Sequence, residues 1–176
     1  MYRANRPLRF VCIALMSIGG FGCAPSLEDG FEDDLTDIGG CADIQFYAVD
    51  DADEVMLGFS VDGLLEAAND AGEEQTTDFD LPSEGVTLTV EVGEKVSDAT
   101  CDDVIENGGP QVVRTYKAIS GTARVVARPG EDQDYTDASG DLLLENVEFE
   151  STEGGAENIT LDSLEILDAK VGWFAG

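Results

Sequence analysis

The amino-acid sequence predicts an all-β domain of antiparallel strands with one short helix. Several segments alternate apolar and polar residues, which is the two-residue period of a strand with one buried face. Clusters of Gly, Asp, Asn and Ser separate these segments, as in a chain that reverses direction repeatedly. We expect an antiparallel β-sandwich of about eight or nine strands, with an up-and-down β-barrel as the alternative.

The strand pattern recurs along most of the chain after residue 40. The segments that carry it are residues 41–49, 55–61, 86–92, 111–119, 122–129, 141–150 and 158–174. The first two flank the acidic turn 50–54 and predict a hairpin. Ser120-Gly121 predicts a tight turn between the fourth and the fifth, and a change of phase near Asn146 predicts a β-bulge.

One segment has the pattern of a helix. Residues 63–70 (GLLEAAND) predict about two helical turns, with Asp62 as the N-cap and Gly72 as the stop signal. The residues between Gly72 and the strand at 86–92 are expected to form an acidic linker.

The chain is very acidic, with 9 Lys and Arg against 38 Asp and Glu. Nucleic acid is therefore excluded as a partner, because phosphate binding needs concentrated Lys and Arg. Since 43% of the residues are hydrophobic, the acids are expected to cover a folded domain and not to mark a disordered chain. Such a surface repels itself, so salt or bound cations should stabilise the domain.

The sequence contains no histidine. Its absence excludes Ser-His-Asp and Cys-His catalysis and histidine-ligated zinc. The sequence contains no recognisable catalytic motif, and we predict that the protein is not an enzyme. A glycan hydrolase built on two carboxylates is the remaining catalytic alternative, and it needs two buried carboxylates that face each other across a cleft.

The N-terminus has the pattern of an export signal. Three arginines within residues 1–9 precede an apolar run, residues 10–22, that is shorter than the ~20 residues of a membrane-spanning helix. Gly22-Cys23 resembles the processing site of bacterial lipoproteins, in which the cysteine is acylated and becomes the first mature residue; Gly20 departs from the aliphatic residue usual in that family. The resemblance implies palmitate at Cys23, membrane attachment through this acyl anchor and, because Ala24 follows, an outer-membrane location. Secretion after ordinary cleavage is the alternative.

The signal and the cysteines predict the organisation of the chain. We expect residues 1–22 to be a signal peptide, residues 23–40 an acylated cysteine with a disordered acidic tether, and residues 41–176 one β domain. If Cys23 is acylated, Cys41 and Cys101 remain to form a disulfide, which would stabilise the fold by roughly 4 kcal/mol in the chain-entropy model.

Two acidic clusters are candidate calcium sites, because calcium prefers carboxylate oxygens in loops. The candidate ligands are Asp50, Asp51 and Asp53, next to Glu54, and Asp132 and Asp134, near Asp137 and Asp141. Neither cluster is an EF-hand, since Asp137 and Leu143 occupy the positions where the loop starting at Asp132 needs Gly and Glu. The alternative is that these acids are simply solvated.

Most bases of the predicted domain lie on two neighbouring predicted strands. They are Arg114, Lys117, Arg124 and Arg128. We expect them to pair with acids across strands. The alternative is a local basic patch that takes an anionic ligand.

Together these features predict a cell-envelope lipoprotein with a non-catalytic binding or structural domain, whose partner is a protein or glycan not identified by the sequence. The alternative is a carrier of a small ligand with a barrel-like cavity. A carrier requires an internal apolar cavity, whereas a binding domain requires a packed core and an exposed patch.

Overall fold

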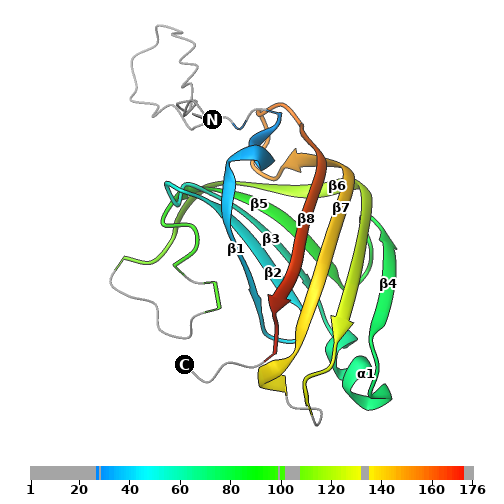
Figure 1. Ribbon diagram of the computed structural model, residues 1–176. Helices are drawn as coiled ribbons and strands as arrows, with labels where there is room; N and C mark the ends of the chain where they lie inside the picture. The colour runs from blue at the N-terminus through cyan, green and yellow to red at the C-terminus, as the bar shows by residue number, and fades with distance from the viewer. Residues whose placement is uncertain (1–26, 28, 99, 102–107, 132–134, 173–176) are drawn as a thin grey trace, which may run out of the picture.

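The computed structural model describes residues 27, 29–98, 100–101, 108–131 and 135–172. These residues form one antiparallel sheet of eight strands, one α-helix and short 3-10 helices (Figure 1). The strands are β1 (Leu35–Cys41), β2 (Gln45–Asp50), β3 (Val55–Val61), β4 (Gln75–Asp80), β5 (Val86–Glu94), β6 (Gln111–Arg128), β7 (Ser139–Ser151) and β8 (Ile159–Lys170). The helix α1 is Leu64–Ala71, and the 3-10 helices are Phe31–Asp34 and Tyr135–Asp137.

Each strand pairs with the next one along the sheet in the order β1-β2-β3-β5-β6-β7-β8. The strand β4 lies off this path and pairs only with β6. Because β6 is 18 residues long, its first half pairs with β5 and its second half with β4, while β7 follows its other edge. The helix α1 connects β3 to β4 at the lower end of the sheet in Figure 1.

The sheet curls until its two end strands, β1 and β8, lie side by side and run in the same direction (Figure 1). At one end of this junction, the N–H groups of Thr160 and Asp162 donate to the carboxylates of Asp29 (3.0 Å) and Glu32 (3.2 Å). At the other end, Gly172 N–H donates to the carbonyl oxygen of Ala42. We call the facing edges of β1 and β8 between these contacts the seam.

The predicted fold class is confirmed: the domain is all-β and antiparallel, with eight described strands and one short helix. The strands form one nearly closed sheet, so the arrangement resembles the barrel alternative more than two stacked sheets. A glycine allows the end strands to approach each other, because a Cβ on Gly40 would lie 2.8 Å from the carbonyl oxygen of Lys170.

The concave face of the sheet is filled by apolar side chains. One cluster of buried residues includes side chains from all strands except β4, and also from α1 and the first 3-10 helix. Its largest members with relative exposure below 2% are Tyr116, Phe46, Phe59, Phe149, Ile44, Leu57, Leu65, Leu142 and Leu144. The interior is therefore a packed core.

The helix is present as predicted, but its N-cap is different. It begins after Gly63, which has a left-handed backbone, and its first N–H groups donate to a carboxylate from another loop, Asp43. Leu65 N–H lies 2.9 Å from Asp43 Oδ1. The prediction that Asp62 caps the helix was wrong, whereas Gly72 ends the helix as predicted.

The turn predicted at Ser120-Gly121 does not exist. The two predicted strands are one strand, β6, and Gly121 (φ +120°) lies opposite a bulge around Asn146 of β7. A Cβ on Gly121 would lie 2.7 Å from the Cα of Val147, so close approach requires this glycine, and not a chain reversal. The bulge predicted near Asn146 is confirmed by its φ of +52° and the register shift beside it.

Two segments predicted to be irregular are part of the fold. The predicted acidic linker contains β4, which alternates half-buried and exposed residues. The fold also includes residues before the predicted boundary at Cys41, since β1 pairs with β2 and both Phe31 and Leu35 are buried. These two apolar side chains anchor a stretch whose many acids had suggested a tether.

Asn69 of α1 tests the packing of the helix against the sheet. It is only 4% exposed, and its two amide atoms have no hydrogen-bond partner. We expect Asn69→Ala to raise the free energy of unfolding by about 1 kcal/mol in urea melts, because it removes unpaired buried polar atoms and favours the helix. Asn69→Asp, the control, should destabilise the protein, and a loss of stability in Asn69→Ala would contradict the packing described.

Candidate functional site

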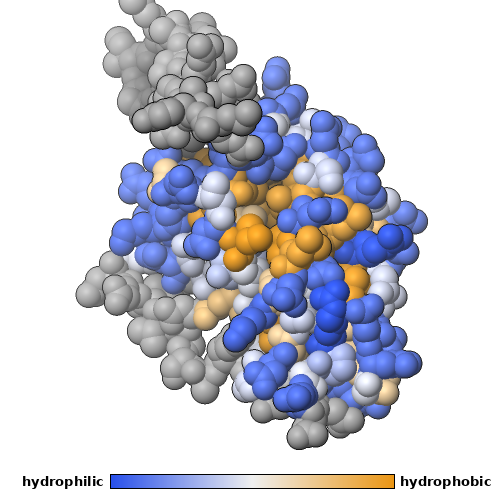
Figure 2. All heavy atoms as spheres, viewed as in Figure 1, coloured by the Kyte–Doolittle hydropathy of each residue, from blue (hydrophilic) through white to orange (hydrophobic). Residues whose placement is uncertain are grey.

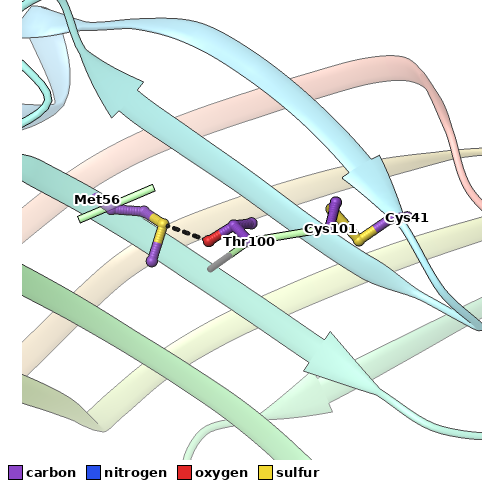
Figure 3. Close-up of a disulfide and its surroundings, with 4 residues drawn as sticks. All are labelled: Cys41, Met56, Thr100 and Cys101. Atoms are coloured by element: carbon purple, nitrogen blue, oxygen red, sulfur yellow. Dashed lines mark hydrogen bonds between the residues drawn. A yellow bond between two sulfur atoms is a disulfide. The ribbon is translucent and has the colours of Figure 1, made fainter. Parts of the chain in front are cut away.

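The predicted disulfide is present and joins the end of β1 to the segment that follows β5 (Figure 3). Cys41 at the end of β1 is bonded to Cys101, with 5.7 Å between their Cα atoms. Just before Cys101, the Thr100 hydroxyl donates to Met56 Sδ at 3.1 Å. Val96 of the same loop is buried with Met56 and Val49 in a second, small apolar cluster. The disulfide and these contacts therefore hold Val96 and Thr100 against β2 and β3.

The acids of the first candidate calcium cluster already accept hydrogen bonds from the protein. Asp50 Oδ1 accepts the N–H groups of Glu54 (2.8 Å) and Val55 (2.9 Å), which closes the turn between β2 and β3. Asp53 accepts Ser97 N–H at 3.0 Å. Asp51 accepts the hydroxyl of a threonine in β1.

The second candidate cluster is only partly described. Asp132 and Asp134 lie outside the described residues. Asp137 is in a 3-10 helix, and Asp141 is bound to an arginine. Within the described part of the chain, no three acidic or cysteine side chains are placed to share a metal ion.

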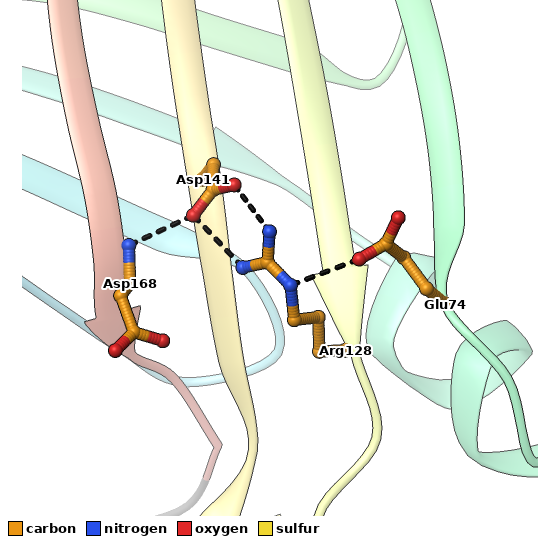
Figure 4. Close-up of polar contacts among 4 residues, drawn as sticks. All are labelled: Glu74, Arg128, Asp141 and Asp168. Atoms are coloured by element: carbon orange, nitrogen blue, oxygen red, sulfur yellow. Dashed lines mark hydrogen bonds and ion pairs between the residues drawn. The ribbon is translucent and has the colours of Figure 1, made fainter.

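Arg128 of β6 binds two carboxylates, one from β7 and one from Glu74, which directly precedes β4 (Figure 4). Its guanidinium binds Asp141 of β7 through both terminal nitrogens, Nη1 at 2.8 Å, and its Nε donates to Glu74 at 2.9 Å. Asp141 also accepts the N–H of Asp168 in β8 at 2.8 Å. The hydrogen bond from Arg128 holds the pKa of Asp141 below its usual value.

Arg124 pairs with Asp78 of β4 at 2.6 Å. The predicted cross-strand pairing of bases with acids is therefore confirmed for Arg124 and Arg128. Lys117 differs, since it belongs to none of the ion pairs found among the described residues. It is exposed at the rim of a depression beside β5.

An exposed apolar area lies on the outside of the seam. Ile38 of β1 is 47% exposed and Leu167 of β8 is 62% exposed. Figure 2 shows an apolar area in the middle of this face, with hydrophilic residues around it. Acids flank both residues in the sequence: Asp37 precedes Ile38, and Asp168 follows Leu167. The adjacent apolar pair Ile166-Leu167, which interrupts the alternation of β8, is the sequence signal that points to this face.

The interior shows neither the carboxylate pair of a glycan hydrolase nor the cavity of a carrier among the described residues. The buried polar residues there are Asn69 and Ser151, and every described Asp and Glu is at least partly exposed. Two depressions of about 230 Å³ each include exposed residues of the sheet in their lining. Residues available for binding therefore lie on the outside of the sheet.

The ion pair at Asp141 predicts a pH dependence. Because its pKa is lowered in the folded state, the pair stabilises the protein above the unfolded pKa of about 3.9 and is lost as the pH falls through the folded pKa. We expect Asp141→Asn to lower the free energy of unfolding at pH 7 by about 1 kcal/mol, allowing for solvent screening. Urea melts from pH 7 to pH 2 should show this difference vanish in acid. Asp78→Asn, which removes a solvated pair, is the control and should change less; an equal loss at both sites would contradict the assignment.

Among the described residues, no helix is both long and apolar enough to cross a membrane. The chain matches no family model, no curated protein and no solved structure.

Proposed function

We propose that the protein is an exported, lipid-anchored component of the bacterial cell envelope whose β domain binds a protein partner and catalyses no reaction. The anchor rests on the sequence: a basic start, an apolar run and Gly22-Cys23. Several acyl chains on Cys23 would hold the chain at a membrane more firmly than one. An outer-membrane location is part of the proposal, with secretion as the alternative.

The exposed apolar area on the seam carries the binding part of the proposal. Soluble domains seldom leave aliphatic side chains as exposed as Leu167 within one apolar area that polar residues surround, and such areas commonly mark interfaces. The surrounding acids favour a partner with an apolar contact residue and basic neighbours, because opposite charges at the rim speed association and exclude acidic competitors. The filled interior favours this function over a carrier.

The proposal is tested with the full chain in a bacterial host, as wild type and as Cys23→Ser. Labelled palmitate should enter the wild type and not Cys23→Ser, and only the wild type should sediment with membranes. Label in both proteins, or in neither, would contradict the anchor.

In the same cells, a photo-crosslinking residue replaces Leu167 or, as the control, Val113 of β6, which is 51% exposed. We expect one discrete adduct from position 167, none from position 113, and loss of the adduct when Ile38→Ser is added. Equal adducts from both positions, or none from position 167, would contradict a binding face at the seam.

A further inference from the structure

A second site lies where the long strand β6 changes partner. The strand β4 ends at Asp80 and β5 begins at Val86, so the two neighbours of β6 meet end to end with a short loop between them. We call the place where β4 gives way to β5 along β6 the fork. A depression of about 230 Å³ lies there. Its apolar lining includes Leu81, Pro82 and Val86. The depression therefore lies where the sheet changes from one strand pairing to the next.

Polar side chains also line the depression. Thr87 and Thr89 of β5 and Lys117 of β6 line it, and Thr89 lies directly opposite Lys117 in the ladder. The two hydroxyls and the ammonium group are hydrogen-bond donors next to an apolar wall. This pairing of donors with an apolar surface is the usual composition of a small-molecule site.

Lys117 differs from Lys95, Arg124 and Arg128 because it forms none of the ion pairs found among the described residues. Arg124 and Arg128 on the same strand are bound to carboxylates, and Lys95 lies 3.7 Å from Asp98. The residue opposite Lys117 on β7 is Glu150, yet these two side chains do not form one of the described ion pairs. Its positive charge is therefore available at the rim of the depression.

We propose that this depression binds a small organic anion, with its carboxylate on Lys117 and the threonine hydroxyls and its apolar part against Leu81, Pro82 and Val86. The negative charge of the chain opposes binding mainly through nearby acids such as Glu150, opposite Lys117 on β7, because charges more than about 8 Å away are largely screened at physiological ionic strength. The volume is below that of sites for drug-sized molecules, so the ligand has few atoms. This site does not depend on the anchor or on the seam.

The test uses cyclohexanecarboxylate as the probe and cyclohexylmethanol as its neutral counterpart. Amide chemical shifts of the protein are followed by NMR during each titration, at constant ionic strength and pH 7. We expect saturable shifts confined to residues around the fork, with the carboxylate bound more tightly than the alcohol. Equal binding of the two compounds, shifts elsewhere, or no saturable shift would overturn the proposal.

Lys117→Met and Thr89→Val test the contacts, and Lys170→Met is the matched control, since Lys170 is also an exposed lysine outside the described ion pairs. We expect Lys117→Met to weaken carboxylate binding about tenfold and to leave alcohol binding unchanged. Thr89→Val should weaken it less, and Lys170→Met not at all. An unfolded Lys117→Met would be recognised from its amide spectrum, and Thr89→Val then decides: unchanged affinity in that variant would overturn the proposal.

Discussion

The structure depends on how the two end strands of the sheet, β1 and β8, are joined. Seven strands follow one another antiparallel from β1 to β8, so the two end strands run in the same direction. Neighbouring parallel strands make slanted bonds, and among the described residues β1 and β8 form no ladder along the junction. Instead, Asp29 and Glu32 accept backbone N–H groups of β8 at one end, and Ala42 and Gly172 meet at the other. This closure seals the apolar core and leaves an apolar face outside.

The same use of carboxylates recurs across the domain and gives part of the acidity a structural role. Asp43 accepts N–H groups at the start of α1, Asp50 closes a turn and Glu153 accepts Thr115 N–H at 3.1 Å. The hydrogen bond from Thr115 lowers the pKa of Glu153 below its usual value. Hydrogen bonds of this kind explain why these carboxylates lie where they do without requiring a metal ion. At Asp50, Asp51 and Asp53 the hydrogen bonds occupy one carboxylate oxygen each, so calcium binding at these residues stays a prediction.

Local patterns predicted the elements well where neighbouring residues determine them. Alternation located most strands, the pairing of Cys41 with Cys101 was predicted from the cysteines left if Cys23 is acylated, and the phase change at Asn146 identified a bulge. Predictions failed where a distant partner decides: Asp43 replaced Asp62 as the cap, and Gly121 serves a close contact with β7. The seam and the fork were not predictable, since they arise from which strands meet. Arg128 was expected to pair with an acid, but the sequence could not show that the acids are Asp141 and Glu74, because this depends on how the strands align with one another.

Hydrogen exchange at the seam tests the closure most directly. In Asp29→Ala/Glu32→Ala, the amides of Thr160 and Asp162 lose the acceptors that protect them and should exchange faster, while amides of the β3–β5 ladder keep their rates. The control, Asp33→Ala/Asp34→Ala, changes exposed acids of the 3-10 helix that contains Glu32 and should leave all these amides unaffected. Unchanged exchange of Thr160 and Asp162 in the first variant, or equal acceleration in both, would contradict a sheet closed by side-chain carboxylates.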